Sequence, residues 1–542
     1  MRHARSPCPS LVFLAGGVLF AALLVGCGPR ESAVESGIRT ATLHYGNGAE
    51  PQELDPHLVT GLTESAIQRT LFEGLVIPDP QTALPVPAAA AGWTSSSDGR
   101  VVTFTLRPDG QWSDGRPVTA DDFVYSFRRL FTATLGAEFA TEFYFIHGAR
   151  EFHRRETADF ATVGVTALDP LTLRFTLIDP VPQFLPLLFG SAAMPVPAHV
   201  LERHGSFAKR GTAWTRPGNL VGNGPFLLKE WAQNQHVLVT RNPAYRGPFP
   251  SRLEAIRFYP VEDASTEERM FRAGQLHHTK HVPFAKIPAL RREQAASLRS
   301  APENRNYYYV FNINRAPFTD VRVRHAFALA LDRGLIVNRV LQGGQQPARR
   351  FAPPSTLEPP VPEQFSDNVT AARALLTEAG FPGGAGLPVI TLLISNDEGS
   401  RLLAEAVQEM LRQHLGVGLE IVAQEWKVYL DSLKQGDYHL SYDSWGFATA
   451  HQFYSLLTTG NSASYNLWSD PSYDRLVAAA AATNDPAQRA KLYAEMETHL
   501  ARVMPVIPVY FNVSNHLVHP SVEGWHANPL DDHFLPSVAF GR

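Results

Sequence analysis

The sequence predicts an α/β protein of two or three domains, and three observations lead to this fold class. Val102, Phe104 and Leu106 alternate with threonines, and a period of two is typical of a half-buried strand. Phe123 and Phe127 lie four residues apart, as on one face of an amphipathic helix. Segments of these two kinds alternate along 542 residues, of which 44% are hydrophobic, so the chain can bury more than one core.

The amino-terminal segment has the pattern of a secretory signal that ends in a lipoprotein cleavage site. Arginines precede an apolar stretch over residues 11–25, which is shorter than the ~20 residues that a membrane-spanning helix needs. Small residues then come directly before a cysteine in Leu24-Val25-Gly26-Cys27. We therefore expect residues 1–27 to hold a signal peptide with its lipobox, cleavage before Cys27 and lipidation of the Cys27 thiol. The alternative is an uncleaved anchor helix.

Cysteine usage bears on how the mature protein is held together. The sequence has two cysteines, and Cys8 would leave with the signal, so only Cys27 would remain. An exported chain without a disulfide depends on the packing of its cores. Residues 28–37 are expected to form a flexible tether that holds the folded body near a membrane surface.

The charge balance argues against one class of function. Lysine and arginine number 48 against 52 aspartates and glutamates, which gives a net charge of -4, and no long basic run occurs. Proteins that bind nucleic acid need a basic patch or stripe. We therefore expect no nucleic-acid partner.

The first half of the chain alternates strands and helices. A short strand begins at Leu43, a helix covers residues 63–72, and the loop Thr60-Gly61-Leu62 before it is a candidate wall of a ligand pocket. Thr119 precedes Asp122 by three residues, which predicts an N-capped helix. Further strands are predicted at residues 102–106, 171–177 and 237–240.

The second half repeats this alternation. Asp320 is a plausible N-cap of a helix that follows a strand at residues 307–314. Residues 347–362 and 380–388 are rich in proline or glycine and are expected to be loops. The remaining strands are predicted at residues 389–394, 419–424, 438–445 and 506–511, and the remaining helices at residues 400–414, 426–433, 471–482 and 486–503.

The stretch from residue 434 to residue 468 contains the best local candidate for a ligand contact. Its aromatic strand ends at Trp445 and passes directly into Gly446. A tryptophan at the end of a strand, beside flexible backbone, often lines a pocket. The alternative is a core aromatic side chain, which is the commoner role of a buried tryptophan.

No catalytic motif emerges from the sequence. Ser206 and Lys209 match a Ser-x-x-Lys pattern, but no Lys-Thr-Gly partner follows, and the hydrolase elbow, the zinc-protease motif and the phosphate loop are missing. The glycines around Gly384 lack the third glycine of a dinucleotide loop and indicate a turn. We expect neither an enzyme nor a cofactor.

Three histidines lie within five residues at His277, His278 and His281, next to Lys280. They could bind a metal, since imidazole is a common ligand. The favoured alternative is a solvated or cleft-edge loop, because no flanking carboxylate or cysteine completes a closed site.

A series of short motifs along the chain resembles those of a known protein family. As a set and in this order, they resemble those of the substrate-binding proteins of peptide ABC importers, solute-binding protein family 5, of the oligopeptide-binding type. The resemblance covers nearly all of the mature chain. The motifs are Leu54-Asp55-Pro56-His57, Leu71-Phe72-Glu73-Gly74-Leu75, Trp112-Ser113-Asp114-Gly115, Thr119-Ala120-Asp121-Asp122-Phe123, Asn223-Gly224-Pro225-Phe226, Val321-Arg322-Val323-Arg324, Asp332-Arg333, Gln424-Glu425-Trp426-Lys427 and Pro508-Val509-Tyr510.

The resemblance implies a receptor with the type II periplasmic-binding-protein-like fold, in which two lobes with a hinge and an extra third domain enclose the ligand. It implies binding, an ABC permease as membrane partner, a lipid anchor and a monomeric state. The implied divisions are residues 38–72, 197–299 and 515–542 for lobe I, residues 73–196 for the extra domain II, and residues 300–514 for lobe III.

The resemblance also implies a ligand site. In this family the peptide backbone is held like an added strand by segments that correspond to Thr60-Gly61-Leu62 and Ser444-Trp445-Gly446. Ala448 stands where an aspartate normally pairs with the peptide's ammonium, and the positions of the usual basic side chains correspond to Ser400, Leu433 and Tyr442. The implied ligand-binding residues are Thr60, Gly61, Leu62, Trp426, Tyr442, Asp443, Ser444, Trp445, Gly446 and Ala448.

Three hypotheses follow from the missing charges. The ligand is an oligopeptide, with a blocked or modified end or with its ammonium met by Asp443, Glu138 or Glu142. Alternatively, the same scaffold binds a non-peptide solute such as a sugar, an opine-like compound or a metal chelate near the histidines. The third hypothesis, an acylase-type enzyme, is disfavoured.

Overall fold

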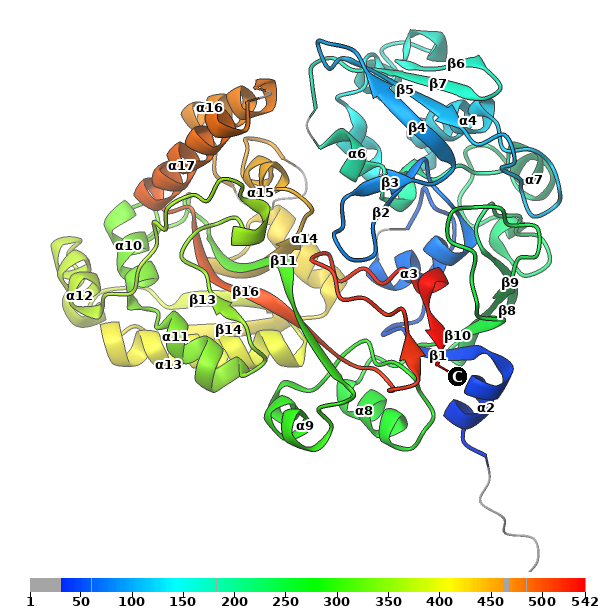
Figure 1. The fold of residues 1–542 in the computed structure, drawn as a ribbon. Coiled ribbons are helices and arrows are strands. Elements are labelled where there is room, and N and C mark those ends of the chain that lie inside the picture. Colours follow the sequence, from blue (N-terminus) through cyan, green and yellow to red (C-terminus); the bar gives the residue numbers. More distant parts are fainter. Residues whose placement is uncertain (1–30, 60, 182, 462–466, 484, 542) are drawn as a thin grey trace, which may run out of the picture.

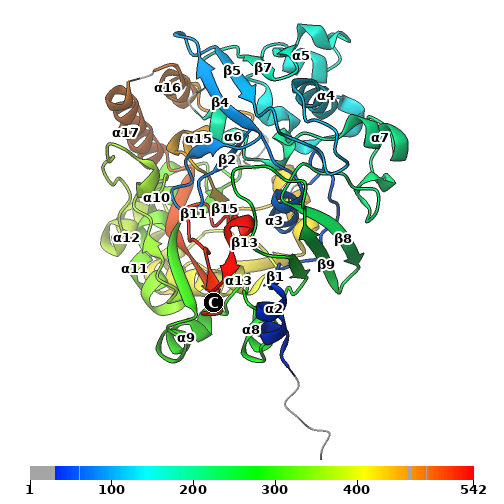
Figure 2. The ribbon, with the colours of Figure 1, turned by 45° about the vertical axis from the view of Figure 1, so that its right-hand side comes forward.

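A computed structural model describes residues 31–541 except 60, 182, 462–466 and 484. The predictions for the signal, for Cys27 and for Thr60 therefore lie outside the described residues. The chain forms two bodies that are joined by two long strands, as Figures 1 and 2 show from two directions. None of the helices described in this range is both long and apolar enough for a membrane crossing.

The first body contains two four-stranded sheets. In one, β1 (Thr42–Gly46) runs parallel to β10 (Ala255–Tyr259), followed antiparallel by β9 (His236–Arg241) and β8 (Phe226–Ala232). The other is antiparallel, in the order β4 (Ala90–Ser95), β5 (Val101–Leu106), β7 (Thr172–Thr176) and β6 (Val165–Asp169). Both sheets contribute to one continuous apolar core, to which Leu43 and Phe104 belong.

The helices of the first body confirm the expected N-caps. Thr119 and Asp122 form a reciprocal capping box at the start of α4 (Ala120–Leu130), which packs Phe123 and Phe127 into the core. The predicted helix at residues 63–72 is α3 (Leu62–Leu71). The remaining elements are α5 (Ala149–His153), α6 (Phe184–Leu187), α7 (Ala198–His204), α8 (Ala264–Arg272), α9 (Ile287–Glu293), the hairpin β2 (Val76–Pro78) and β3 (Pro85–Pro87), and the pair β17 (Val522–Glu523) and β18 (Ala539–Phe540).

The expected tether is wrong in its second half. Helix α2 (Ala33–Thr40) begins within it, because Ser32 and Glu35 form a capping box. Val34 is buried, and its backbone N–H donates to Gly274 O at 2.9 Å. Residues from Ser32 onward therefore belong to the folded body.

The second body is a six-stranded mixed sheet with helices around it. The strand order is β12 (Gln346–Pro347), β16 (Val506–Leu517), β11 (Leu298–Phe311), β15 (Leu440–Gly446), β13 (Ile390–Ser395) and β14 (Leu419–Gln424). Its helices are α10 (Val321–Ala330), α11 (Arg333–Leu335), α12 (Val369–Glu378), α13 (Glu398–Leu415), α14 (Trp426–Gln435), α15 (Ala450–Leu456), α16 (Pro471–Ala482) and α17 (Pro486–Val503). The predicted strands and helices of this region are confirmed, and Asp320 caps α10 as expected.

Two strands cross between the bodies, and both are longer than predicted. β11 and β16 pair antiparallel from Leu298 opposite Leu517 to Val310 opposite Val506, with register shifts between Pro302 and Asn306 and between Tyr307 and Tyr308. Their outer halves are polar, so no apolar alternation marks them as strands. Each strand's outer half is recognised as a strand only because it pairs with the other strand, which is distant in sequence. These two strands connect the two bodies (Figure 1).

Candidate ligand-binding site

The carboxyl-terminal half of β15 lacks a strand partner on one side. β15 pairs with β11 along its whole length, from Leu440 opposite Phe311 to Gly446 opposite Arg305. On its other side, β13 pairs only with Leu440 and Ser441. Within the part of the chain that the structure describes, residues 442–446 thus form an unpaired strand edge, here called the open edge.

Alternation along the strand decides which backbone groups face this edge. Bonds at both ends of the ladder join odd-numbered residues to the β11 side, since Phe447 N donates to Asn304 O at 3.1 Å and Asn312 N donates to His439 O at 3.0 Å. No register shift intervenes. Successive residues of a strand point their backbone groups in opposite directions. Ser444 and Gly446 therefore direct their backbone groups toward the open edge.

Helix α14 forms a wall beside this edge. The Tyr429 hydroxyl donates to the carbonyl of Tyr442, an even-numbered residue of the strand. Trp426 stacks on Tyr429, with ring centroids 5.6 Å apart, and 59% of its surface is exposed. A large exposed aromatic ring next to an unpaired strand edge suits contact with a ligand.

Trp445 is held in place by the carboxyl group of Asp443. Asp443 Oδ2 accepts from Trp445 Nε1 at 3.3 Å and from the Tyr308 hydroxyl at 3.1 Å, while Oδ1 accepts from Ser444 N at 2.8 Å. Burial raises the pKa of the Asp443 carboxyl to about 6. The Trp445 ring stacks on Phe447 and is half-buried against the core of the second body. A ligand contact by Trp445 stays a prediction.

The positions that should carry charge hold none of the expected groups. Ala448 lies half-buried in the bend between β15 and α15. Ser400 donates to Asp397 Oδ2 at 2.6 Å, in the capping network at the start of α13. Leu433 is buried in an apolar cluster, and Tyr442 is buried with its hydroxyl 3.1 Å from that of Tyr510.

One cation that the sequence did not reveal lies beside Gly446, on the β11 side of β15. Arg305 lies opposite Gly446, and a Cβ atom on that glycine would come within 3.1 Å of Arg305 Nη2. Arg305 Nε pairs with Glu303 Oε1 at 2.6 Å. The register between β11 and β15 creates this proximity, and no sequence spacing encodes it.

The other expected wall is only partly described. Gly61 is the N-cap of α3, with extended backbone, and is exposed; for Leu62 the backbone alone is described. Among the described residues, no hydrogen bond joins residues 61–63 to β15. The participation of Gly61 and Leu62 in ligand binding remains a prediction. Neither Glu138 nor Glu142 has a hydrogen bond or ion pair with β15 in the described part of the chain.

The expected loop of histidines is a wrong prediction. His277 and His278 are buried, whereas His281 is exposed. His277 Nδ1 accepts from His44 N at 3.0 Å, and burial lowers the pKa of His277 to about 3. Consecutive residues in an extended segment point in opposite directions, so the three rings do not converge.

The Ser-x-x-Lys pattern is a surface feature. Ser206 and Lys209 are both exposed, and Lys209 N donates to Ser206 O at 3.5 Å within a turn. An activated serine needs an adjacent base in a site that excludes water. Ser206 lies on an exposed turn that does not exclude water.

Cavities elsewhere do not coincide with the open edge. Two cavities among the described residues lie in the first body and share Glu73 and Tyr245. No residue of β15 lines either of them. The candidate site is therefore a strand edge with an aromatic wall.

Two bodies joined by a pair of crossing strands, with a strand edge left unpaired in one of them, define a solute-binding protein of the hinged type. The family model of bacterial extracellular solute-binding proteins, family 5 Middle, matches residues 85–466. The chain belongs to this family.

Curated relatives match nearly the whole chain. It is 35% identical over 539 residues to the periplasmic oligopeptide-binding protein OppA of Salmonella typhimurium, covering 97% of both proteins. It is 33% identical over 499 residues to the probable deoxycholate-binding periplasmic protein YgiS of Escherichia coli, covering 90% of this chain and 91% of that protein.

A solved structure supports the same assignment. The murein tripeptide binding protein MppA of Escherichia coli superimposes with a TM-score of 0.81 at 33% identity, covering 92% of this chain and 98% of that chain. The predicted fold class is confirmed: a periplasmic-binding-protein-like type II fold of two lobes with a hinge and an extra domain. The predicted residue numbers of the domain boundaries remain untested.

Proposed function

We propose that this protein is the extracytoplasmic receptor of an ABC importer and that it captures a peptide or peptide-like ligand as an added strand on the open edge of β15. The observation that carries the proposal is the unpaired edge at residues 442–446, toward which Ser444 and Gly446 direct their backbone groups. Relatives named for oligopeptide and murein tripeptide binding support it.

Binding by strand addition explains how one site accepts varied sequences. Main-chain hydrogen bonds supply affinity, whereas side chains of the ligand alternate between the pocket and solvent. The ligand favours a closed arrangement only if it contacts both bodies. A micromolar ligand supplies about 8 kcal/mol in total.

The preferred ligand has a blocked or otherwise uncharged amino end. Ala448 supplies no carboxylate, and a charge-assisted hydrogen bond would contribute about 1.5–3 kcal/mol. Desolvating an ammonium without a partner costs several kcal/mol more. Arg305, close to Gly446, is the cationic side chain placed to meet an acidic or carbonyl group of the ligand.

A second candidate is a non-peptide solute. One relative of this chain is named as a probable deoxycholate-binding protein, and deoxycholate is a bulky, largely apolar carboxylic acid. Trp426, exposed on the wall of the open edge, and Arg305 would suit the apolar body and the carboxylate of such a ligand. We propose no enzymatic activity, because Ser206 and Lys209 lie on an exposed turn.

The setting of the receptor is proposed from the sequence. Signal cleavage before Cys27 and lipidation of its thiol would anchor a monomer at a membrane, where an ABC permease receives the ligand. The lobes would divide as lobe I at residues 38–72, 197–299 and 515–542, domain II at 73–196 and lobe III at 300–514. Radiolabelled palmitate incorporation that is lost in Cys27→Ser would support the anchor.

The ligand proposal is tested on the purified mature protein. Native mass spectrometry identifies co-purified ligands, and calorimetry then compares free, amino-acetylated and deoxycholate-like ligands. We expect acetylated peptides to bind at least about 10-fold more tightly than their free-amine forms, which corresponds to about 1.4 kcal/mol. Tighter binding of the free-amine forms would reject the uncharged end. Binding of deoxycholate alone would favour the second candidate.

A further inference from the structure

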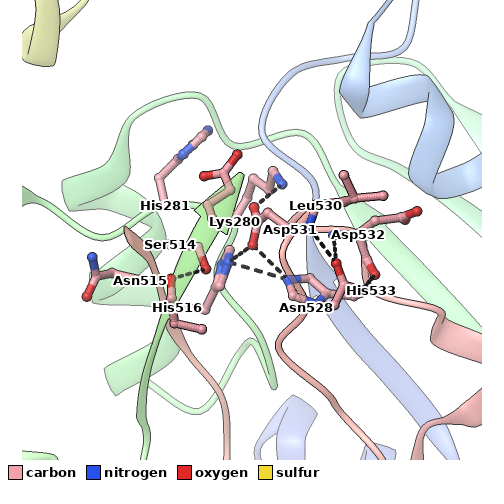
Figure 3. Close-up of polar contacts among 12 residues, drawn as sticks. Lys280, His281, Ser514, Asn515, His516, Asn528, Leu530, Asp531, Asp532 and His533 are labelled. Carbon is pink, nitrogen blue, oxygen red and sulfur yellow. Dashed lines mark hydrogen bonds and ion pairs between the residues drawn. The ribbon is translucent and has the colours of Figure 1, made fainter. Parts of the chain in front are cut away.

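A cluster of buried histidines lies in the first body. His278, His516 and His533 each offer a ring nitrogen, and these atoms lie within 4.8 Å of one another. His516 is at the end of β16, and His533 belongs to the carboxyl-terminal loop together with Asp531, whose Oδ1 lies 2.7 Å from the Nε2 atom of His516 and 3.2 Å from that of His533. Figure 3 shows His516, Asp531 and His533 converging beside Lys280. These three residues and His278 are called the histidine cluster.

Backbone carbonyls determine which ring nitrogens carry hydrogen. His516 Nδ1 lies 3.0 Å from Thr279 O, and His533 Nδ1 lies 3.2 Å from His526 O. A carbonyl only accepts, so each Nδ1 must donate, and in a neutral imidazole Nε2 then presents a lone pair. Both Nε2 atoms are thereby turned toward the same point.

Three atoms direct lone pairs toward this point: Asp531 Oδ1 and the Nε2 atoms of His516 and His533. Asp531 Oδ1 lies 2.7 Å from His516 Nε2 and 3.2 Å from His533 Nε2, and the two Nε2 atoms are 3.4 Å apart. With neutral rings, three acceptors face one another without a donor between them. Such an arrangement requires a positive charge in its centre, which either protons or a metal ion can supply.

Two of the three distances, 3.2 Å and 3.4 Å, match those between ligands of one metal ion, whereas Asp531 Oδ1 would have to move away from His516 Nε2, 2.7 Å distant, to admit the ion. Zinc binds histidine nitrogen at about 2.0–2.1 Å and carboxylate oxygen at about 2.0–2.2 Å, so neighbouring ligands of a tetrahedral ion are about 3.3 Å apart. Metal-binding histidines also donate their other N–H to a carbonyl or carboxylate, which fixes the ring. His516 and His533 both meet this second condition through Thr279 and His526.

His278 completes the set of donors. Its side chain is 1% exposed, and neither ring nitrogen has a hydrogen-bond partner among the described residues. A buried polar group without a partner is costly. The ring stacks on Tyr45 at 4.2 Å and on His516 at 5.0 Å between centroids, and one of its nitrogens lies within 4.8 Å of a ring nitrogen of His516 and of His533.

We propose that His516, His533 and Asp531, with His278 as fourth ligand, bind one divalent transition-metal ion, with zinc preferred. Three imidazoles and one carboxylate suit zinc, copper or nickel and do not suit magnesium or calcium. Lys280 Nζ, 3.3 Å from Asp531 Oδ2, occupies the second carboxylate oxygen and leaves Oδ1 as a single donor atom. The ion would fasten the carboxyl-terminal loop to the crossing strand β16.

The experiment titrates chelator-treated full-length mature protein with zinc chloride. Calorimetry and elemental analysis should show one zinc per chain with Kd below about 10 μM. Cobalt should give the visible absorption of a tetrahedral ion. His533→Gln and Asp531→Asn should each weaken binding by at least about 100-fold, and His278→Phe, which keeps the stacked ring, by about 10-fold. His281→Gln and His519→Gln are matched controls outside the cluster and should bind as the parent does.

Three outcomes would overturn the proposal: no zinc bound below about 10 μM, unchanged affinity in His533→Gln, or equal losses in the two controls. Absence of binding would assign the central charge to protons shared with Asp531. If His533→Gln fails to fold, as judged by circular dichroism, Asp531→Asn decides, and unchanged zinc affinity in that variant would overturn the proposal. An unchanged cobalt spectrum and affinity in His278→Phe would remove His278 from the site.

Discussion

Asp443 in the second body and Asp531 in the first are both carboxyl groups that accept several hydrogen bonds, yet their ionisation is shifted in opposite directions. Neutral donors surround Asp443, and burial raises its pKa to about 6. Burial would also raise the pKa of Asp531, but His516 and Lys280 hold it well below its ordinary value. Hydrogen bonds from Ser444, Tyr308 and Trp445 also favour the charged form of Asp443 but do not offset its burial, whereas the interactions of Asp531 with His516 and Lys280 do.

The two regions therefore suit different partners. The open edge offers backbone groups, aromatic rings and little fixed charge, which favours a ligand without a charged amino end. The histidine cluster brings ring nitrogens and a carboxylate oxygen from three segments of the chain to one point, and these atoms favour a small cation. Four predictions, from the largest expected effect to the smallest, test this contrast.

Removing the carboxylate of the histidine cluster should have the largest effect. In metal-free protein, Asp531→Ala leaves the Lys280 ammonium without its counter-ion, and breaking such a pair costs about 3 kcal/mol of folding free energy. Urea unfolding measures the loss. Asp179→Ala removes an exposed partner of Arg100 and should cost less than about 1 kcal/mol. Equal effects would show that the cluster's charges matter no more than a surface pair.

Restoring a carboxylate at the open edge should change ligand preference. Ala448→Asp should tighten binding of free-amine peptides by about 30-fold, because an ion pair with the ammonium forms. Amino-acetylated peptides should show no gain. Ala448→Asn, which matches the shape without the charge, serves as control in calorimetry. A gain of the same size in Ala448→Asn would mean that shape and not charge limits binding.

The pH should affect only ligands with an ammonium group. The Asp443 carboxyl is mostly neutral below its pKa of about 6 and negative above it. Free-amine peptides should therefore bind more tightly at pH 7 than at pH 5, by at most about 10-fold. Acetylated peptides should show no such change. Persistence of the trend in Asp443→Asn would assign it to another group.

Blocking one backbone donor of the open edge should have the smallest effect. Gly446→Pro removes an N–H directed at the added strand and should weaken all peptides by about fivefold, the equivalent of about 1 kcal/mol. Gly418→Pro is a control, since that exposed glycine has free space around it. If Gly446→Pro binds peptides like the parent, the ligand does not pair with this edge.

Much of the fold was predictable because its signals are local. The capping box at Thr119 and Asp122 and the alternation around Phe104 each lie within a few residues, and both elements form as expected. The tether prediction failed although part of the missed signal is local: Ser32 and Glu35 lie three residues apart, and only the contact with Gly274 is distant in sequence. Ser32 begins a helix inside the expected tether because its capping box is completed by Glu35 and its helix is anchored by Gly274.

The sequence by itself determined the interleaved elements, the family motifs and the alanine at position 448, where the resemblance implies a carboxylate. Only the tertiary structure decided that Arg305 stands beside Gly446 and that His516 and His533 meet at Asp531. Periodic patterns and caps act over one or two turns of chain, so they can be read in order. Strand register brings Arg305 to Gly446 across more than a hundred positions, and loop packing folds Asp531 and His533 back onto His516; no spacing in the sequence records either.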